Sequence, residues 1–170
     1  PRSSSAASDV YKRQGEGVRF VAAHEVGHAI GLPHNMGSSS AYPVDSLRSK
    51  TFTKKFGTAP SIMDYARWNY VAQPGDEGVA LMPSYWDTPN IGLYDKYSIM
   101  WGYKPILGVS AEEEKKILQS WILEKQDDLT YRYGDPGIDP SSQTEDLGDN
   151  AVKASEYGIC LLYTSPSPRD

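Results

Sequence analysis

Apolar residues recur every three or four positions over residues 18 to 30, which is the period of a helix with one apolar face. No proline interrupts this segment. Gly31 follows it and suits the left-handed conformation that ends many helices, while Pro33 cannot continue a helix. We therefore expect a helix with a sharp reversal after it. Its apolar positions are Val18, Val21, Ala22, Val26, Ala29 and Ile30.

Two further helices are predicted in the second half of the chain. The first runs from Asp95 to Trp101 and is expected to end at Gly102. The second begins at Ser110, which forms a capping-box pattern with Glu113, and continues to about Lys125. We expect its apolar stripe to lie in the core: Ile117, Leu118, Trp121 and Ile122. The stretches around residues 35 to 60 and 72 to 92 contain many Gly, Pro and Ser residues and are predicted to be loops.

Both ends of the chain resemble translated sequencing adapter of the transposase-tagging type. Residues 4 to 14 read SSAASDVYKRQ, and residues 160 to 170 read CLLYTSPSPRD. We therefore interpret residues 1–14 and 160–170 as adapter-derived and exclude them from the fold prediction. Residues 15–159 remain as part of one catalytic domain, and any signal peptide is expected upstream of them.

Charge and composition exclude several classes of protein. The two end segments hold four basic and two acidic residues, so without them the net charge changes from −5 to −7. An acidic chain of this kind is a poor candidate for binding nucleic acid or anionic membranes. No apolar run approaches the roughly 18 residues of a transmembrane helix. Residues 15–159 contain no cysteine and so no disulfide, and the residues do not determine the oligomeric state.

All three histidines of the chain lie between residues 24 and 34. On the predicted helix, His24 and His28 are four positions apart, so their rings project from one face and can reach a single ion. The reversal at Gly31 allows His34 to return as a third ligand. Three neutral imidazoles and a water molecule suit one Zn²⁺ ion with an open coordination position, as in catalytic rather than structural zinc sites.

Glu25 follows the first of these histidines and should point beside the metal rather than at it. A carboxylate in that position can accept a proton from the water that zinc activates. Glu25 is therefore the candidate general base, and a zinc-dependent hydrolase is the favoured class of enzyme.

The pattern HEVGHAIGLPH resembles the zinc signature of the metzincin metallopeptidases, H-E-x-x-H-x-x-G-x-x-H. That superfamily also has a methionine turn below the metal, and SIMDY, residues 61 to 65, is similar to it with Met63 at the methionine position. Tyr65 occupies the place where astacin- and serralysin-type metzincins carry a tyrosine. By this resemblance, Tyr65 either ligates zinc or hydrogen-bonds the reacting carbonyl. A tyrosine packed within the turn is the structural alternative.

Residues 35 to 76 and the segments IGLYDKYSIMWGYKPI and QTEDLGDNAVKASEYGI resemble the bacterial "met-zincin" domain of large exported zinc-dependent metalloproteases. The resemblance implies an α+β metzincin-like zincin fragment, which holds the active-site helix and a mainly helical C-terminal subdomain. The sheet of such a domain is expected upstream of residue 15. Asn35 departs from better-known metzincins after the third histidine, so their substrate subsites do not transfer.

The resemblance implies a secreted bacterial endopeptidase that hydrolyses peptide bonds in protein or peptide substrates. Two alternatives remain, namely a zinc-binding module without turnover and a zinc hydrolase that acts on substrates other than peptides. The acidic residues of the C-terminal stretch (Asp135, Asp139, Glu145, Asp146 and Asp149) would offer ligands for calcium, but their spacing lacks the EF-hand pattern. We therefore predict a solvated loop there.

Overall fold

The computed structural model describes residues 2–66, 68–82, 91–135, 137 and 139–164. These residues form five α-helices and three short 3₁₀ segments connected by long loops. The α-helices are α1 (Arg2–Ala29), α2 (Lys50–Phe56), α3 (Leu93–Tyr103), α4 (Ala111–Leu123) and α5 (Ala151–Thr164). The 3₁₀ segments are η1 (Ser39–Ala41), η2 (Val44–Arg48) and η3 (Leu129–Tyr131).

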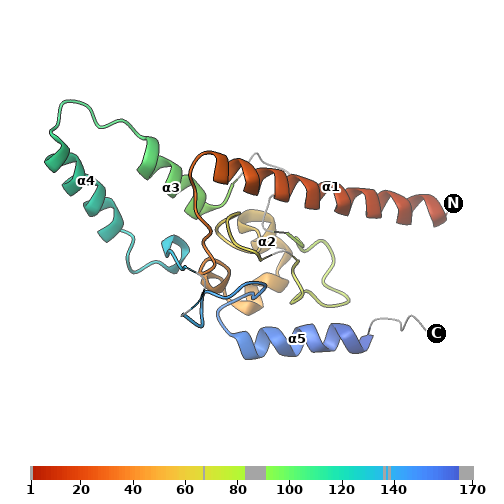
Figure 1. Ribbon diagram of the computed structural model, residues 1–170. Coiled ribbons are helices and arrows are strands. Elements are labelled where there is room, and N and C mark those ends of the chain that lie inside the picture. Colours follow the sequence, from red (N-terminus) through yellow and green to blue (C-terminus); the bar gives the residue numbers. More distant parts are fainter. Residues whose placement is uncertain (1, 67, 83–90, 136, 138, 165–170) are drawn as a thin grey trace.

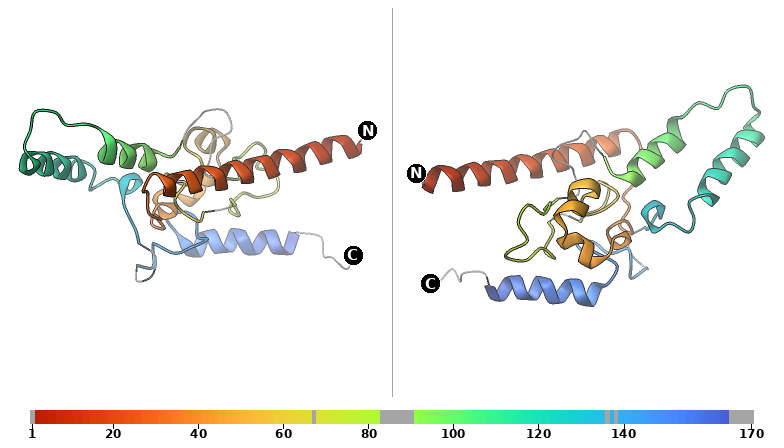
Figure 2. Two further views of the ribbon diagram at one scale, coloured as in Figure 1. Left: turned by 45° about the horizontal axis from the view of Figure 1, so that its top comes forward. Right: turned by 180° about the vertical axis from the view of Figure 1, so that it is seen from behind.

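The helices surround a loop-rich centre (Figure 1). The long helix α1 and the C-terminal helix α5 lie on opposite sides of the segment that contains α2, as the further views also show (Figure 2). Helices α3 and α4 extend away from this centre on the side of the C-terminal end of α1. Loops rather than helices therefore form most of the interior, and the helices hold them in place.

Two separate apolar clusters stabilise this arrangement. The larger one joins α2, the central loops and α5, and its buried members are Tyr42, Val44, Leu47, Ala59, Ala66, Val71, Leu147 and Ala154. The smaller one lies beneath the C-terminal half of α1 and comprises Phe20, Leu32, Ile62, Met63 and Met82. The smaller cluster fixes the segment that contains Met63 against α1. This contact is the part of the fold that positions the histidines.

The helix predicted over residues 18 to 30 lies within α1, which starts much earlier, at Arg2, and ends at Ala29. Residues 2–14 therefore continue the same helix, and α5 likewise extends past residue 159. Val18 and Val21 are 70 % and 54 % exposed, so most of the predicted apolar face is open. The sheet that the resemblance predicts upstream would be expected to pack against this face.

Helix α3 begins at Leu93 and ends at Tyr103, so the prediction that Gly102 ends it is wrong. Gly102 lies inside the helix, and the extended residue that follows it is Lys104, with φ −71° and ψ 115°. Pro105 comes next, and the ring of a proline sterically disfavours the helical conformation of the residue before it. The proline rather than the glycine determines this boundary.

Helix α4 has the predicted capping box, because Ser110 Oγ accepts from the N–H of Glu113 and the Glu113 carboxylate accepts from the N–H of Ser110. The prediction that its apolar stripe is core is wrong. Ile122 is 49 % exposed, and no residue of α4 is buried. The helix projects away from the centre, so its stripe does not pack into the interior, and Ile122 at its end lines a cleft beside α3.

Helices and loops account for all the described residues, which include no strand. The mainly helical subdomain that the sequence predicts is thus present, while the sheet of the expected α+β class remains a prediction about the region upstream. No helix within the described part of the chain is long and apolar enough to cross a membrane.

The acidic C-terminal stretch is more ordered than the predicted solvated loop. Asp146 is half-buried and accepts a hydrogen bond from Ser39 Oγ at 2.8 Å, and Asp149 accepts from the backbone N–H of Val44 at 3.0 Å. Asp139 forms an ion pair with Arg132. These three carboxylates bind protein groups and fasten the stretch to the centre of the molecule, which leaves calcium without support from the structure.

Candidate metal centre

Helix α1 ends in a hydrogen-bonded reversal that brings the third histidine back to the first two. The N–H of Gly31 donates to the carbonyl of His28, and the N–H of Leu32 donates to the carbonyl of Gly27, both at 2.9 Å. This is the Schellman arrangement, which requires a left-handed residue at the position of Gly31. Gly31 has φ +88°, as the sequence predicted.

The three histidines meet at one point. One ring nitrogen from each of His24, His28 and His34 lies within 4.8 Å of the other two, and the Nε2 atoms of His28 and His34 are 3.0 Å apart. Two nitrogens that bind one tetrahedral zinc ion at about 2 Å lie about 3.3 Å from each other. The trio is therefore already close to the spacing that a single ion needs.

Backbone carbonyls orient two of the rings. The Nδ1 atom of His24 lies 2.7 Å from the carbonyl oxygen of Ile62, and that of His28 lies 2.9 Å from the carbonyl oxygen of Leu32. A carbonyl can only accept, so the proton of each neutral ring resides on Nδ1 and the Nε2 lone pair is left for a metal. The donor set thus fits zinc in identity, and two of its three rings fit in tautomer as well.

The surroundings of the third ring favour the neutral form that a metal requires. Burial lowers the pKa of His34, and the neighbouring His28 and His24 lower it further. Only Glu25 acts in the opposite direction. A neutral imidazole presents a lone pair instead of a proton, so its binding to a metal ion costs no deprotonation at neutral pH.

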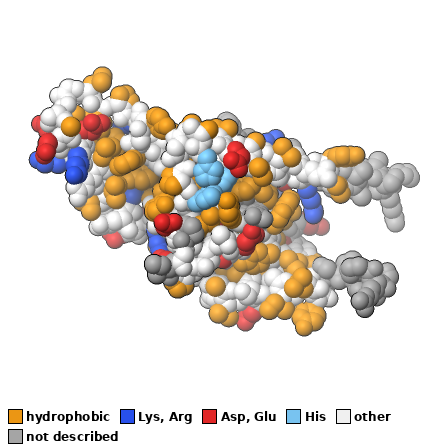
Figure 3. Space-filling view, viewed as in Figure 1, with side chains coloured by type: hydrophobic (Ala, Val, Ile, Leu, Met, Phe, Trp, Pro, Cys, Tyr) orange, Lys and Arg blue, Asp and Glu red, His pale blue; other side chains and the backbone are white. Residues whose placement is uncertain are grey.

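Glu25 lies on the solvent side of this group. Its side chain is exposed, and its charge acts on His34 nine positions further along the chain. Figure 3 shows the histidines on an open face of the molecule with an acidic side chain next to them. The carboxylate is thus accessible to water and close to the point where the three rings meet.

The turn that contains Met63 lies directly beneath the histidines. Met63 is fully buried, and its carbonyl accepts a hydrogen bond from the N–H of Asn35 at 3.1 Å. A side chain on Gly27 would place its Cβ 2.4 Å from Met63 Sδ, so any larger residue would force the methionine side chain to shift. The glycine within HEVGH therefore serves the contact between the zinc-binding helix and the turn.

The comparison with known families agrees with this geometry. A family model described as Met-zincin matches residues 9–165. The chain belongs to the Met-zincin family. No curated protein and no solved structure matches the chain. The match includes parts of both end segments that we interpret as adapter-derived, and that interpretation stays a prediction.

Tyr65 of this Met-zincin lies on the metal side of the turn. The centre of its ring is 4.7 Å from the centre of the His34 ring and 5.5 Å from that of His24. The side chain is half-buried, so it is neither enclosed in the core nor turned away into solvent. The phenol therefore borders the space in front of the three imidazoles.

Asp95 in α3 is a residue of the site to which the sequence assigned no role. Its buried carboxylate accepts hydrogen bonds from Ser61 Oγ at 2.6 Å, from the N–H of Ile62 at 2.9 Å and from the N–H of Gly92 at 2.9 Å. Burial raises its pKa, whereas these hydrogen bonds lower it. Since the carbonyl of Ile62 orients His24, Asp95 holds the turn on which that ligand depends. The signal in the sequence was only an acid at the third position of a helix.

Replacing Asp95 with Asn should therefore weaken both the fold and metal binding. The amide NH₂ would face at least one of the three donors, and each lost hydrogen bond to a buried charge costs about 1.5–3 kcal/mol. We expect a lower melting temperature and an affinity for Zn²⁺ that is reduced by about tenfold or more, the typical effect of disturbing a group that orients a ligand. Zinc titration and thermal melts of the variant measure this, with exposed Asp127→Asn as the matched control. Parent-like zinc affinity in Asp95→Asn would contradict the role given to Asp95.

Asn35, where the sequence departs from better-known metzincins, has a structural role. It is fully buried, its Nδ2 donates to the carbonyl of Arg132 and its Oδ1 accepts from the N–H of Gly134, both at 2.9 Å. The residue after the last histidine thus fixes the segment 132–134 next to the metal centre.

Proposed function

We propose that this Met-zincin is a zinc-dependent endopeptidase that hydrolyses peptide bonds. The observation that supports it most is the set of three imidazoles, two of them oriented by backbone carbonyls, with an exposed carboxylate and a phenol beside them. Such a set matches the needs of amide hydrolysis, which are an activated water, a base and a donor for the carbonyl oxygen. The family match alone would support only a metallopeptidase-like function.

His24, His28 and His34 would hold one zinc ion. When bound, zinc polarises the scissile carbonyl and lowers the pKa of water. Glu25 accepts the proton of the attacking water and later delivers it to the leaving amine. Tyr65 donates a hydrogen bond to the carbonyl oxygen as it gains negative charge.

Two other functions compete with this proposal. A zinc-binding module without turnover would be expected to supply a fourth Cys or His ligand. Among the described residues, the group of candidate His, Cys, Asp and Glu ligands comprises only the three histidines. A zinc hydrolase that acts on other substrates would use the same residues, so only a substrate assay separates it from a peptidase.

The full-length protein should cleave casein when it is loaded with Zn²⁺, should lose this activity to a chelator and should regain it when Zn²⁺ is restored. Cleavage that persists after zinc is removed would contradict a zinc-dependent mechanism. Zinc-loaded protein that cleaves no peptide bond but hydrolyses a simple ester would favour the non-peptide alternative.

His34→Ala should release the metal, because it removes one of three protein ligands. The loss should exceed the 10- to 100-fold that is typical for a group that only supports a ligand. After dialysis against a mild chelator, metal analysis should find zinc in the parent and none in the variant. Equal zinc content in both proteins would show that His34 is not a ligand.

We also infer, from the resemblance to exported bacterial metalloproteases, that the protein acts outside the bacterial cytoplasm. Its substrates would then be proteins or peptides of the periplasm, the cell surface or the medium. Fractionation of the native host with an antibody against residues 15–159 tests this inference, and protein found in the cytoplasm alone would refute it.

A further inference from the structure

His34 differs from the other two candidate ligands in how its ring is held. The rings of His24 and His28 each bind a backbone carbonyl through Nδ1. Within the described part of the chain, the hydrogen bond of the His34 ring joins it to Nε2 of His28, and none joins it to a backbone carbonyl. The position of the third ring therefore depends on the backbone that carries it.

That backbone is fixed on both sides of His34. Pro33 precedes it, and the proline ring confines its own φ angle. On the other side, the N–H of Asn35 donates to the carbonyl of Met63 at 3.1 Å. This bond joins the peptide group between His34 and Asn35 to the methionine turn. The side chain of Asn35 adds a second connection, to a distant part of the chain.

The amide of Asn35 binds the backbone of residues 132–134 at two points. Its Nδ2 donates to the carbonyl of Arg132, and its Oδ1 accepts from the N–H of Gly134, both at 2.9 Å. A carbonyl can only accept and an N–H can only donate, so the two bonds also fix which way the amide faces. Asn35 is fully buried, so water does not compete for these bonds. We call this pair of bonds the amide clamp.

Two glycines allow the clamped segments to lie so close together. A Cβ on Gly134 would lie 2.7 Å from the Cα of Gly37 and 2.2 Å from Ser142 Oγ, and the N–H of Gly37 donates to the carbonyl of Gly134 at 3.3 Å. A backbone atom cannot rotate aside as a side chain can. A larger residue at position 134 would therefore push this segment away from the residues that follow His34.

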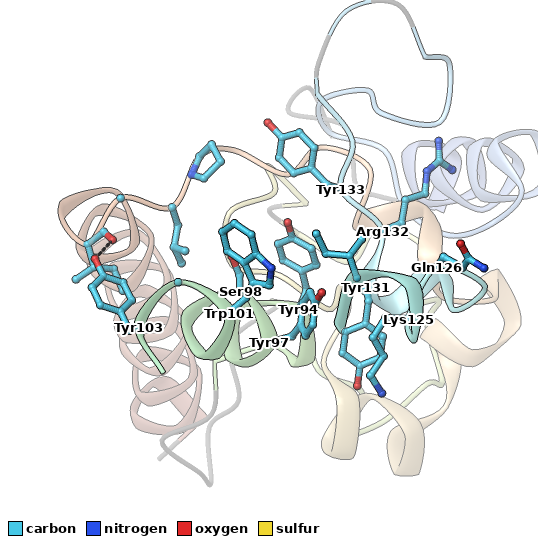
Figure 4. Close-up of a pocket in the computed structure, with 16 residues that line it drawn as sticks. Tyr94, Tyr97, Ser98, Trp101, Tyr103, Lys125, Gln126, Tyr131, Arg132 and Tyr133 are labelled. Atoms are coloured by element: carbon cyan, nitrogen blue, oxygen red, sulfur yellow. Dashed lines mark hydrogen bonds between the residues drawn. The ribbon is translucent and has the colours of Figure 1, made fainter. Parts of the chain in front are cut away.

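The segment 132–134 is itself well supported. Figure 4 shows that it continues from η3, whose Tyr131 lies beside Tyr97 of α3 at a cleft of about 720 Å³. The centres of these two rings are 5.4 Å apart, and the Arg132 side chain forms an ion pair with Asp139. The clamp therefore attaches Asn35 to a fixed support.

We propose that Asn35 is a positioning residue of the metal centre, which holds His34 where it can share one zinc ion with His24 and His28. The inference rests on the proposed function, in which these three histidines bind zinc. Without the clamp, the third ligand would occupy its binding position for a smaller fraction of the time. The apparent affinity for the metal falls in proportion to that fraction, while the centre that forms once zinc is bound stays the same.

Zinc titration of the full-length protein tests this proposal. Asn35→Ala should weaken zinc binding by about tenfold or more, which is typical for the loss of a group that orients a ligand. Asn69→Ala is the matched control, because Asn69 is also buried and its Nδ2 donates to the carbonyls of Leu47 and Ala80. Both variants should melt at a lower temperature than the parent, but only Asn35→Ala should lose zinc affinity. Parent-like zinc affinity in Asn35→Ala, or an equal loss in Asn69→Ala, would overturn the proposal.

Gly134→Ala tests the other side of the clamp and leaves Asn35 and the histidines unchanged. It should also weaken zinc binding by about tenfold. Gly102→Ala is its control and should not, because a Cβ on Gly102 would meet nothing within 4 Å outside its own helix. The double variant with Asn35→Ala should lose little more affinity than either single variant, since both changes break the same contact. Losses that multiply would contradict a shared clamp. If Asn35→Ala does not fold, Gly134→Ala and its control decide the question.

The zinc dependence of casein cleavage separates this proposal from the peptidase proposal. Asn35→Ala should be much less active than the parent at limiting zinc and should approach the kcat of the parent at saturating zinc, because the bound metal then holds His34 in place. A parent that binds zinc but cleaves no peptide would refute the peptidase proposal, and the titrations would still decide the role of Asn35. A zinc-dependent parent with unchanged zinc affinity in Asn35→Ala would refute the positioning role alone. A parent that binds no zinc would refute both.

Discussion

Glu25→Gln is expected to abolish peptide hydrolysis while zinc stays bound. The amide has nearly the shape of the carboxylate but cannot accept the proton of the attacking water, and loss of a general base alone costs about 10²- to 10⁴-fold in kcat. Zinc should be retained in the variant. The charge of Glu25 raises the pKa of His34, so removing that charge lowers this pKa and favours the unprotonated ring that binds the metal. Both halves of this result follow from the position of Glu25 beside the ligands.

The measurement compares casein cleavage and zinc content in purified full-length parent and variant. Glu16→Gln is the matched control, because it makes the same chemical change on the same helix away from the histidines. The control should keep parent-like activity. A Glu25→Gln protein that cleaves casein at the parent rate would mean that another group acts as the base.

Tyr65→Phe is expected to lower kcat by about 10²-fold, with little change in KM, zinc content or melting temperature. The ring lies 4.7 Å from that of His34 and stays in place in the variant, so only the hydroxyl is lost. A hydrogen bond that forms to the oxyanion acts in the transition state alone, and one such donor is typically worth about 3–4 kcal/mol.

Tyr42→Phe provides the control for this experiment, because it deletes a phenolic hydroxyl in the other apolar cluster, which has no part in the metal centre. Its kcat should equal that of the parent. The result for Tyr65→Phe also separates the possible roles of the phenol. A fall in zinc content would favour a metal ligand, and an unchanged kcat would favour a tyrosine that only packs within the turn.

Short sequence patterns predicted the structural features that depend on residues close together in the chain. The reversal at Gly31 follows from the backbone freedom of glycine and from the proline after it, and it appears with φ +88°. The capping box of Ser110 and Glu113 depends on residues three positions apart, so it too could be predicted. The grouping of His24, His28 and His34 combines helical spacing with this same reversal.

Features that depend on distant contacts could not be predicted in this way. The apolar stripe of α4 has the helical period of a buried face, but periodicity does not tell whether a partner covers that face, and here no residue of the helix is buried. The sequence predicted that Asp146 and Asp149 are solvated, because acidic residues usually are. Asp149 is exposed as predicted, whereas Asp146 is half-buried, and they accept hydrogen bonds from Val44 and Ser39, more than a hundred positions away.

The sequence by itself determined the grouping of the three histidines, because their spacing and the reversal at Gly31 depend on a single helix and its end. Only the tertiary structure decided what lies around that centre. It placed Met63 against Gly27, Tyr65 beside His34, and Asp95 beneath the turn that orients His24. These contacts join segments 30 to 70 residues apart, and they arise from packing and burial, which no short pattern records.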